Sequence, residues 1–265
     1  MAAPNPAKQK AARARLKQLF AHPSTVFVVH YACQSFGQTQ QQGSPRIAAI
    51  AVRNLESGQT ASFSIHQELE LMRLPSWESM AHLDELEWAM LTRYFDFIRE
   101  HKGMRFIHWN MRDLKFGFAA LEHRFAVLGG RPHALPDHQL HDLAIAIAEL
   151  YGSTYLPRPH LWHLAKKNGL SLRGFVDGKD EPAVFNRGEY SAVQVSTLCK
   201  VAIIADVASH AEHRTLRTDA NWWVLNKGRI REACEMFEDN PLRAILGTVF
   251  AVGMFAFATV ARFIN

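Results

Sequence analysis

The chain is poor in cysteine and has no cysteine-rich motif. Its 265 residues include three cysteines, Cys33, Cys199 and Cys234, which lie far apart and form no Cys-x-x-Cys pair. Disulfide scaffolds and zinc ribbons need several cysteines at short spacings, so the sequence excludes both classes. A reducing cytosol is the expected setting.

The chain also lacks a strong excess of charge of one sign. Thirty Lys and Arg residues stand against 25 Asp and Glu, which gives a net charge of +5 and a pI near 9.2. This excess fits nucleic acid or an anionic membrane surface, and it equally fits an ordinary solvated surface. With 48% hydrophobic residues, the chain has enough apolar material for one substantial core, so it is not a disordered polyelectrolyte.

No secretory apolar region stands at the N-terminus. Residues 1–22 instead carry basic side chains among alanines, and we expect a basic helix there. The basic residues are Lys8, Lys10, Arg13, Arg15 and Lys17. The pattern leaves open whether this helix is simply solvated or contacts phosphates or lipid headgroups.

Residues 24–215 alternate between short β-branched runs and segments with helical spacing, which predicts an α/β domain. We expect strands at 25–31, 46–54, 59–67 and 104–109, with a hairpin turn at 56–59. Helices are expected at 84–101, 114–128, 142–151, 160–168 and 188–213. A junction at 216–242, rich in both charge signs, follows this domain.

A long uncharged run lies near the end of the chain. Residues 244–261 contain no charge and are bounded by Arg243 and Arg262. Eighteen such residues are at the short end of the range that spans a bilayer, so residues 243–264 are expected to form a single-pass C-terminal anchor with the main domain cytoplasmic. A buried core helix is the alternative. Gly247 and Ala251 form a small-xxx-small pair that favours homo-oligomers.

Several local sequences resemble motifs of one nuclease superfamily. They are 106–110 followed by 120–124, 140–143 at the start of an apolar helix, 160–170, and Glu189-Tyr190 at the start of the longest helix. In this order they resemble the DEDD 3′–5′ exonucleases of the ribonuclease H-like superfamily, over residues 24–211. The resemblance implies a ribonuclease H-like mixed sheet flanked by helices, with three antiparallel strands and then parallel strands. It also implies hydrolysis of phosphodiesters by two metal ions, Mg or Mn.

The acidic metal ligands of that superfamily are largely missing. Its first motif is Asp-x-Glu at the end of the first strand, where this chain has His30/Ala32 or Tyr31/Cys33, depending on the register. The second Asp falls on Leu114, next to Asp113, and the last falls on Gln194. Asp113 is either a displaced ligand or the N-cap of the following helix. At most one of four acids remains, so Mg and Mn should bind poorly.

The candidate site residues follow from these positions. The catalytic candidates are Asp113, Asp142, Tyr190 and Gln194. Candidates for nucleic-acid contact are Asn110, Lys166, Lys167 and Arg173, with Lys179 nearby. A transition-metal site is conceivable from His30, His108 and Asp113, because the two histidines lie on strands that are neighbours in this superfamily.

Three functions remain open on the sequence. The first is a membrane-tethered, exonuclease-like domain with compromised catalysis, a pseudo-enzyme that binds nucleic acid or a nucleotide in the groove. The second is an active metal-dependent 3′–5′ exonuclease with a rearranged site, which would need Mg or Mn. The third is a membrane structural or signalling protein that assembles through its tail.

Overall fold

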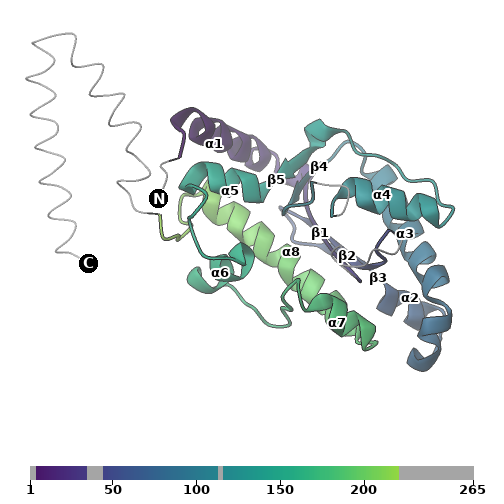
Figure 1. Ribbon diagram of the computed structural model, residues 1–265. Coiled ribbons are helices and arrows are strands. Elements are labelled where there is room, and N and C mark those ends of the chain that lie inside the picture. Colours follow the sequence, from purple (N-terminus) through teal and green to yellow (C-terminus); the bar gives the residue numbers. More distant parts are fainter. Residues whose placement is uncertain (1–3, 35–43, 113–115, 221–265) are drawn as a thin grey trace, which may run out of the picture.

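The centre of the protein is a five-stranded mixed β-sheet (Figure 1). The computed structural model describes residues 4–34, 44–112 and 116–220. The strands are β1 (Val26–Cys33), β2 (Ile47–Asn54), β3 (Thr60–Ser64), β4 (Arg105–His108) and β5 (Leu140–Asp142). Their order is β3-β2-β1-β4-β5; β1 and β3 pair antiparallel with β2, whereas β4 pairs parallel with both β1 and β5. The predicted α/β class with a mixed sheet is confirmed.

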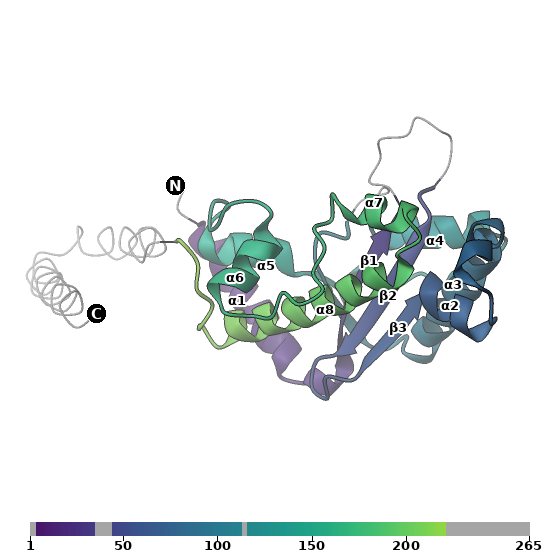
Figure 2. The ribbon, with the colours of Figure 1, turned by 90° about the horizontal axis from the view of Figure 1, so that it is seen from below.

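Helices cover both faces of this sheet. The helices are α1 (Pro6–Phe20), α2 (Ile65–Leu71), α3 (Leu83–Glu100), α4 (Phe118–Val127), α5 (Leu143–Tyr151), α6 (His160–Lys167), α7 (Glu181–Asn186) and α8 (Tyr190–Glu212). Buried residues of α2, α3 and α4 share one apolar cluster with the strands, whereas α1, α5, α6 and most of α8 share a second cluster. Figure 2 shows α8 running across the sheet, with α1, α5 and α6 gathered toward one end of α8.

The first strand supplies both clusters because its side chains alternate between the two faces. Val26 and Val28 pack in the cluster of α8, whereas Phe27, Val29 and Tyr31 pack in the cluster of α3. Every residue of β1 is buried. Burial on both faces explains why the run is β-branched and aromatic without polar alternation.

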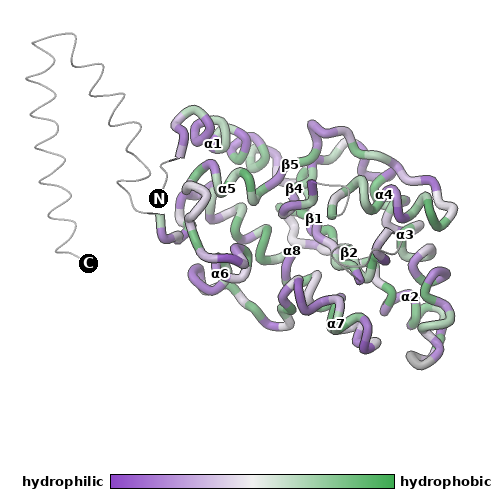
Figure 3. Tube along the Cα trace, in the orientation of Figure 1, coloured by the Kyte–Doolittle hydropathy of each residue, from purple (hydrophilic) through white to green (hydrophobic). Residues whose placement is uncertain are grey.

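The basic N-terminal helix is part of the second cluster. Its apolar side, Ala12, Leu16 and Leu19, is buried against α5 and α8. Arg13 donates a hydrogen bond to the carbonyl of Ala211 at 2.7 Å, and Arg15 forms an ion pair with Glu149. The hydrophilic colouring of α1 in Figure 3 therefore includes cations that hold the helix to its neighbours.

Two expected boundaries differ from the structure by three residues or more. The third strand, expected to run to residue 67, ends at Ser64, whose hydroxyl accepts a hydrogen bond from the Gln67 N–H at 3.1 Å. This N-cap begins α2 and turns the chain away from the sheet. Helix α4 begins at Phe118, after Gly117, whose N–H donates to the Tyr31 hydroxyl at 2.9 Å.

Among the described residues, α8 is long and apolar enough to cross a membrane by length and composition. However, more than half of its most apolar window is buried within the protein, and the helix contacts β1, β2, β3 and α1. This packing is that of a core helix in a folded domain. The predicted anchor at 243–264, with Gly247 and Ala251, lies outside the described residues, as does the junction from residue 221 onward.

Candidate functional site

A cavity of about 810 Å³ opens beside His30 of β1 and beyond the carboxyl end of β4, between α5, α6, α7 and α8, and we call it the central cleft. Its floor consists of His30, Glu181 and Lys200, all of which are buried. Its other lining residues include Trp109, Asn110, Arg112, Phe116, Arg158, His160, Trp162, Phe175, Asp177 and Lys179. The edge of a parallel sheet at the carboxyl ends of its strands is a common place for a ligand site.

An ion pair forms the floor of the central cleft. The Lys200 ammonium on α8 donates to the Glu181 carboxylate on α7 at 2.7 Å, and neither side chain is more than 5% exposed. The Ser196 hydroxyl donates to the same carboxylate oxygen at 3.0 Å and accepts a hydrogen bond from the Val176 N–H. Burial raises the pKa of Glu181, and the neighbouring ammonium opposes this rise.

His30 of β1 lies close to this ion pair and is 7% exposed. Burial, and then the positive charge of Lys200, lower the pKa of His30 to about 3. The imidazole is therefore neutral at physiological pH. Its Nδ1 atom is buried and has no hydrogen-bond partner among the described residues.

The rim of the central cleft combines cations with aromatic rings. Arg112, Arg158 and Lys179 are exposed there, and Trp162 and Phe175 are half-buried. No ion pair forms at Arg158 or Lys179 within the part of the chain that the structure describes. Exposed cations beside aromatic rings are the arrangement that binds the phosphates and bases of single strands.

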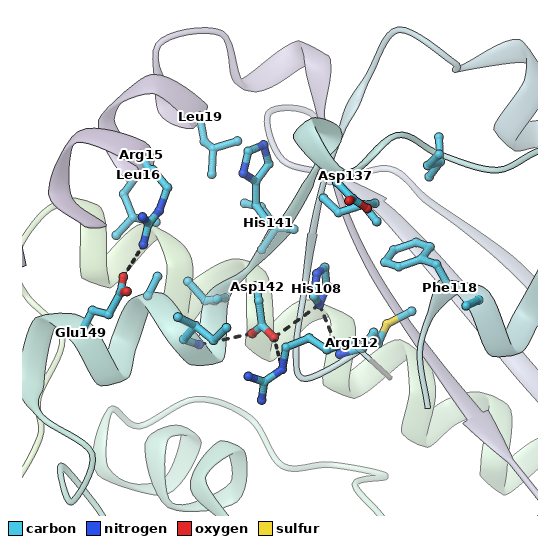
Figure 4. Close-up of a pocket in the computed structure, with 18 of the residues that line it drawn as sticks. Arg15, Leu16, Leu19, His108, Arg112, Phe118, Asp137, His141, Asp142 and Glu149 are labelled. Atoms are coloured by element: carbon cyan, nitrogen blue, oxygen red, sulfur yellow. Dashed lines mark hydrogen bonds and ion pairs between the residues drawn. The ribbon is translucent and has the colours of Figure 1, made fainter. Parts of the chain in front are cut away.

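A second cavity of about 610 Å³, which we call the edge pocket, lies beside β5 between α1, α4 and α5. Figure 4 shows the Asp142 carboxylate pointing toward Arg112 and His108, while Arg15 and Glu149 pair across the far side. Arg112 Nε lies 2.8 Å from Asp142, and the same carboxylate accepts the Ala144 N–H at 2.8 Å as the N-cap of α5. The Asp142 carboxylate is thus already paired with the Arg112 cation and with the first turn of α5.

The two candidate histidines lie on opposite faces of the sheet. In the parallel pair of β1 and β4, His108 is level with Val29, so His30, one residue further, points the other way. Accordingly, His30 lines the central cleft, whereas His108 lines the edge pocket. Burial first, and the nearby Arg112 and His141 as well, lower the pKa of His108 to about 4, against the opposing effect of Asp142. The register does not bring His30 and His108 into one metal site, and Asp113 lies outside the described residues.

The predicted catalytic positions on α8 lie away from both cavities. The Tyr190 hydroxyl is 3.3 Å from the Ser79 hydroxyl, and Gln194 Nε2 donates to Ser62 of β3 at 2.9 Å. The first turns of α8 therefore contact β3 and residues 76–81, whereas Lys200, further along the helix, lines the central cleft with His30. The structure therefore does not bring Tyr190 and Gln194 together with Asp142, which lines the edge pocket.

Some of the candidates for nucleic-acid contact lie at the central cleft, and the others do not. Asn110 lines the central cleft and accepts a hydrogen bond from Arg112 at 2.7 Å. The Lys166 ammonium lies 4.9 Å from the ring centre of Trp162, a residue of the cleft wall. Lys167 forms an ion pair with Asp219 instead. Arg173 is exposed and does not line the cleft.

Sequence reasoning missed three residues of the central cleft, Lys200, Glu181 and Arg158. Lys200 carried a usable signal, because it is the one charged residue between positions 190 and 205 of a long apolar helix. A lone cation in such a run requires a buried partner. Glu181 and Arg158 had no comparable signal, since Glu181 begins a short helix and Arg158 lies in an irregular segment.

The side chains of this region do not fit the pair of Mg or Mn ions that the resemblance implies. Among the described residues, no three His, Cys, Asp or Glu side chains are grouped so that they could hold a metal ion. Glu181 is paired with Lys200, and Asp142 with Arg112, so a cation already neutralises each carboxylate. Hard divalent ions need several free oxygen ligands, which this set does not supply.

Comparison with known proteins gave no relative from which to assign a family. No protein-family model matches the chain, and no curated protein sequence matches it.

Proposed function

We propose that this chain carries a ribonuclease H-like, exonuclease-like domain with compromised catalysis, which binds single-stranded nucleic acid or a nucleotide in the central cleft. The sheet order β3-β2-β1-β4-β5, with antiparallel pairs first and parallel pairs after, supports the fold assignment. The motif-like segments 106–110 and 140–143 also lie at the carboxyl ends of β4 and β5, beside the two cavities.

The observation that carries the proposal is the composition of the central cleft. Exposed Arg158 and Lys179 stand at a rim that includes the Trp162 ring, above a floor with a buried ammonium. Base stacking on an aromatic ring contributes about 1–3 kcal/mol per base, and cations at the rim attract phosphates. A volume of about 810 Å³ lies within the range of small-molecule and nucleotide sites.

Compromised catalysis follows from the partners of the two acidic residues nearest the strand ends. Arg112 pairs with Asp142, and Lys200 pairs with Glu181. A metal ion would have to displace these cations, at the cost of leaving them buried or unpaired. The domain is therefore better suited to holding a strand than to cleaving it.

We further propose that residues 243–264 hold this domain at a membrane. The uncharged run at 244–261 supports the anchor, and Gly247 and Ala251 support pairing of two copies. The test is membrane extraction of the expressed chain. The protein should stay in the membrane at alkaline pH and be released by detergent, and release at alkaline pH without detergent would overturn the anchor.

Binding to the cleft is tested with fluorescent single-stranded DNA and RNA of about one to two dozen nucleotides, in EDTA. Arg158→Ala/Lys179→Ala should weaken binding by about tenfold or more, because each lost phosphate contact removes a charge-assisted interaction. Lys102→Ala, a change at an exposed lysine remote from the cleft, is the matched control and should bind like the wild type. Equal binding by all three proteins would overturn the assignment of the cleft.

A further inference from the structure

The floor of the central cleft has unused hydrogen-bonding capacity. A lysine ammonium carries three N–H donors. Among the described residues, the one hydrogen bond formed by Lys200 Nζ goes to Glu181 Oε1, at 2.7 Å. The centre of the Phe175 ring lies 5.1 Å from Nζ. Two donors of a buried cation are therefore available to a ligand.

The groups beside Lys200 are also incompletely satisfied. The Nδ1 atom of His30 and the Oε2 atom of Glu181 are buried without a hydrogen-bond partner in the described parts of the chain. Buried polar atoms are nearly always paired, so the spare positions of this cluster indicate a group or water that completes them. The Lys200 and His30 nitrogens can donate to a bound oxyanion, whereas Glu181 Oε2 is an acceptor and needs a donor such as water. The cluster lies at the bottom of a cavity, where a bound molecule reaches it.

The charge of the cluster determines which group fits. Lys200 and Glu181 cancel, His30 is neutral, and Arg112 is paired with Asp142. The rim then adds the positive charges of Arg158 and Lys179 against Asp177. An oxyanion accepts hydrogen bonds from the ammonium and is attracted by the rim. A second cation is disfavoured, because the ammonium occupies the carboxylate that would hold it.

We propose that Lys200 is the built-in cation of a phosphate subsite, so that the floor of the central cleft takes the terminal phosphate of a nucleic-acid strand or nucleotide without a divalent metal ion. This inference rests on the proposed function and specifies its ligand. A terminal phosphate reaches the floor because it is the narrow end of the nucleic-acid strand. The phosphates within a strand stay at the rim, flanked on both sides by further nucleotides.

The test compares three versions of one labelled oligonucleotide, with a 5′-phosphate, a 3′-phosphate or hydroxyl groups at both ends, in EDTA. The wild-type chain should bind one phosphorylated form about tenfold or more tightly than the hydroxyl form, because the terminal phosphate gains charge-assisted hydrogen bonds. In Lys200→Met/Glu181→Gln, which removes both charges and so leaves no unpaired buried ion, the ratio should fall to about one. Arg158→Ala/Lys179→Ala should weaken all three forms and keep the ratio.

The two proposals fail in different ways. If the oligonucleotides bind without any end preference, the proposed function stands and the phosphate subsite is overturned. If none of them binds, the proposed function fails, and inorganic phosphate alone then tests the floor by its effect on the wild-type melting temperature. Stabilisation by phosphate that is lost in the double variant would keep the subsite, and equal behaviour of both proteins would overturn it.

Discussion

Lys200 and Glu181 form an ion pair of 2.7 Å on the floor of the central cleft, and both side chains are almost completely buried. Two adjacent helices of the second half of the domain, α7 and α8, are joined by this contact. The pair lies in the same cleft as His30, one of the positions where the resemblance predicts an acid of the first motif. Its energetics and its consequences for binding are both accessible to experiment.

Removing one partner of this pair should be strongly destabilising. Lys200→Met leaves a buried carboxylate without its cation, and a cost of about 3–5 kcal/mol in the free energy of unfolding is expected. In Lys200→Met/Glu181→Gln no charge is left unpaired, so most of this loss should be recovered. Urea denaturation of the two variants measures both values.

Lys167 provides a matched control for that measurement. It forms an ion pair with Asp219 on the surface, where both side chains are more than a third exposed. Lys167→Ala should change the free energy of unfolding by ~1 kcal/mol or less, because solvent screens an exposed pair. Equal losses for Lys167→Ala and Lys200→Met would contradict the assigned role of burial.

A second buried network, around Glu87, should be equally sensitive. Glu87 of α3 accepts two hydrogen bonds from Arg124 of α4, at 2.9 and 2.5 Å, and one each from Arg46 and the Ile47 N–H. Glu87→Ala removes the common acceptor and leaves the buried guanidinium of Arg124 with the exposed carboxylate of Asp84 as its partner, so a loss of about 3 kcal/mol is expected. Thermal or urea unfolding measures this loss. The control is Glu85→Ala, an exposed position two residues earlier on α3, where the free energy of unfolding should hardly change.

Stability should decrease in mild acid because of His30. Its pKa is about 3 in the folded protein and about 6.5 when the residue is exposed by unfolding. Between these values the unfolded chain binds a proton that the folded chain does not, so the free energy of unfolding falls as pH falls from 6.5 toward 3. The slope is up to ~1.4 kcal/mol per pH unit for this histidine.

The variant His30→Phe tests that assignment, because it removes the titrating group and keeps a ring of similar shape. Its unfolding free energy should depend less on pH over the same range than that of the wild type. His123→Phe, at an exposed position of α4, is the control and should keep the wild-type slope. An unchanged slope in His30→Phe would show that other groups account for the acid sensitivity.

The rim of the central cleft should also determine the salt dependence of binding. Each phosphate contact to a single strand adds about 0.7 to the slope of log affinity against log salt concentration. Arg158→Ala/Lys179→Ala should therefore reduce the slope by up to about 1.4, twice this value. A titration of binding at several salt concentrations measures the slope, and a loss of affinity with an unchanged slope would argue against contacts to phosphates.

The sequence predicted the parts of the fold that depend on local patterns. The unbroken β-branched run at 25–31 and the helical spacing at 84–101 correspond to β1 and α3, with boundaries shifted by one or two residues. The third strand was predicted three residues too long. The Ser64 side chain caps a helix there, and the apolar residues that follow fit a helix as well as a strand.

The candidate site was harder to predict, because it depends on which face each side chain occupies. His30 and His108 lie on neighbouring strands, yet the register places them on opposite faces. Tyr190 and Lys200 lie on the same helix, yet Tyr190 contacts Ser79 whereas Lys200 lines the central cleft. Such relations are set by packing between segments far apart in the chain, and a local motif does not contain them.

The most direct measurement is equilibrium binding of a fluorescent single-stranded oligonucleotide to the 265-residue chain in EDTA and in Mn²⁺, with the length of the strand followed on a gel. The proposed function predicts saturable binding in EDTA that depends on Arg158 and Lys179, and a strand that remains intact in Mn²⁺. Rapid degradation of the strand in Mn²⁺, or no binding in EDTA, would contradict a central cleft that holds nucleic acid with its own cations.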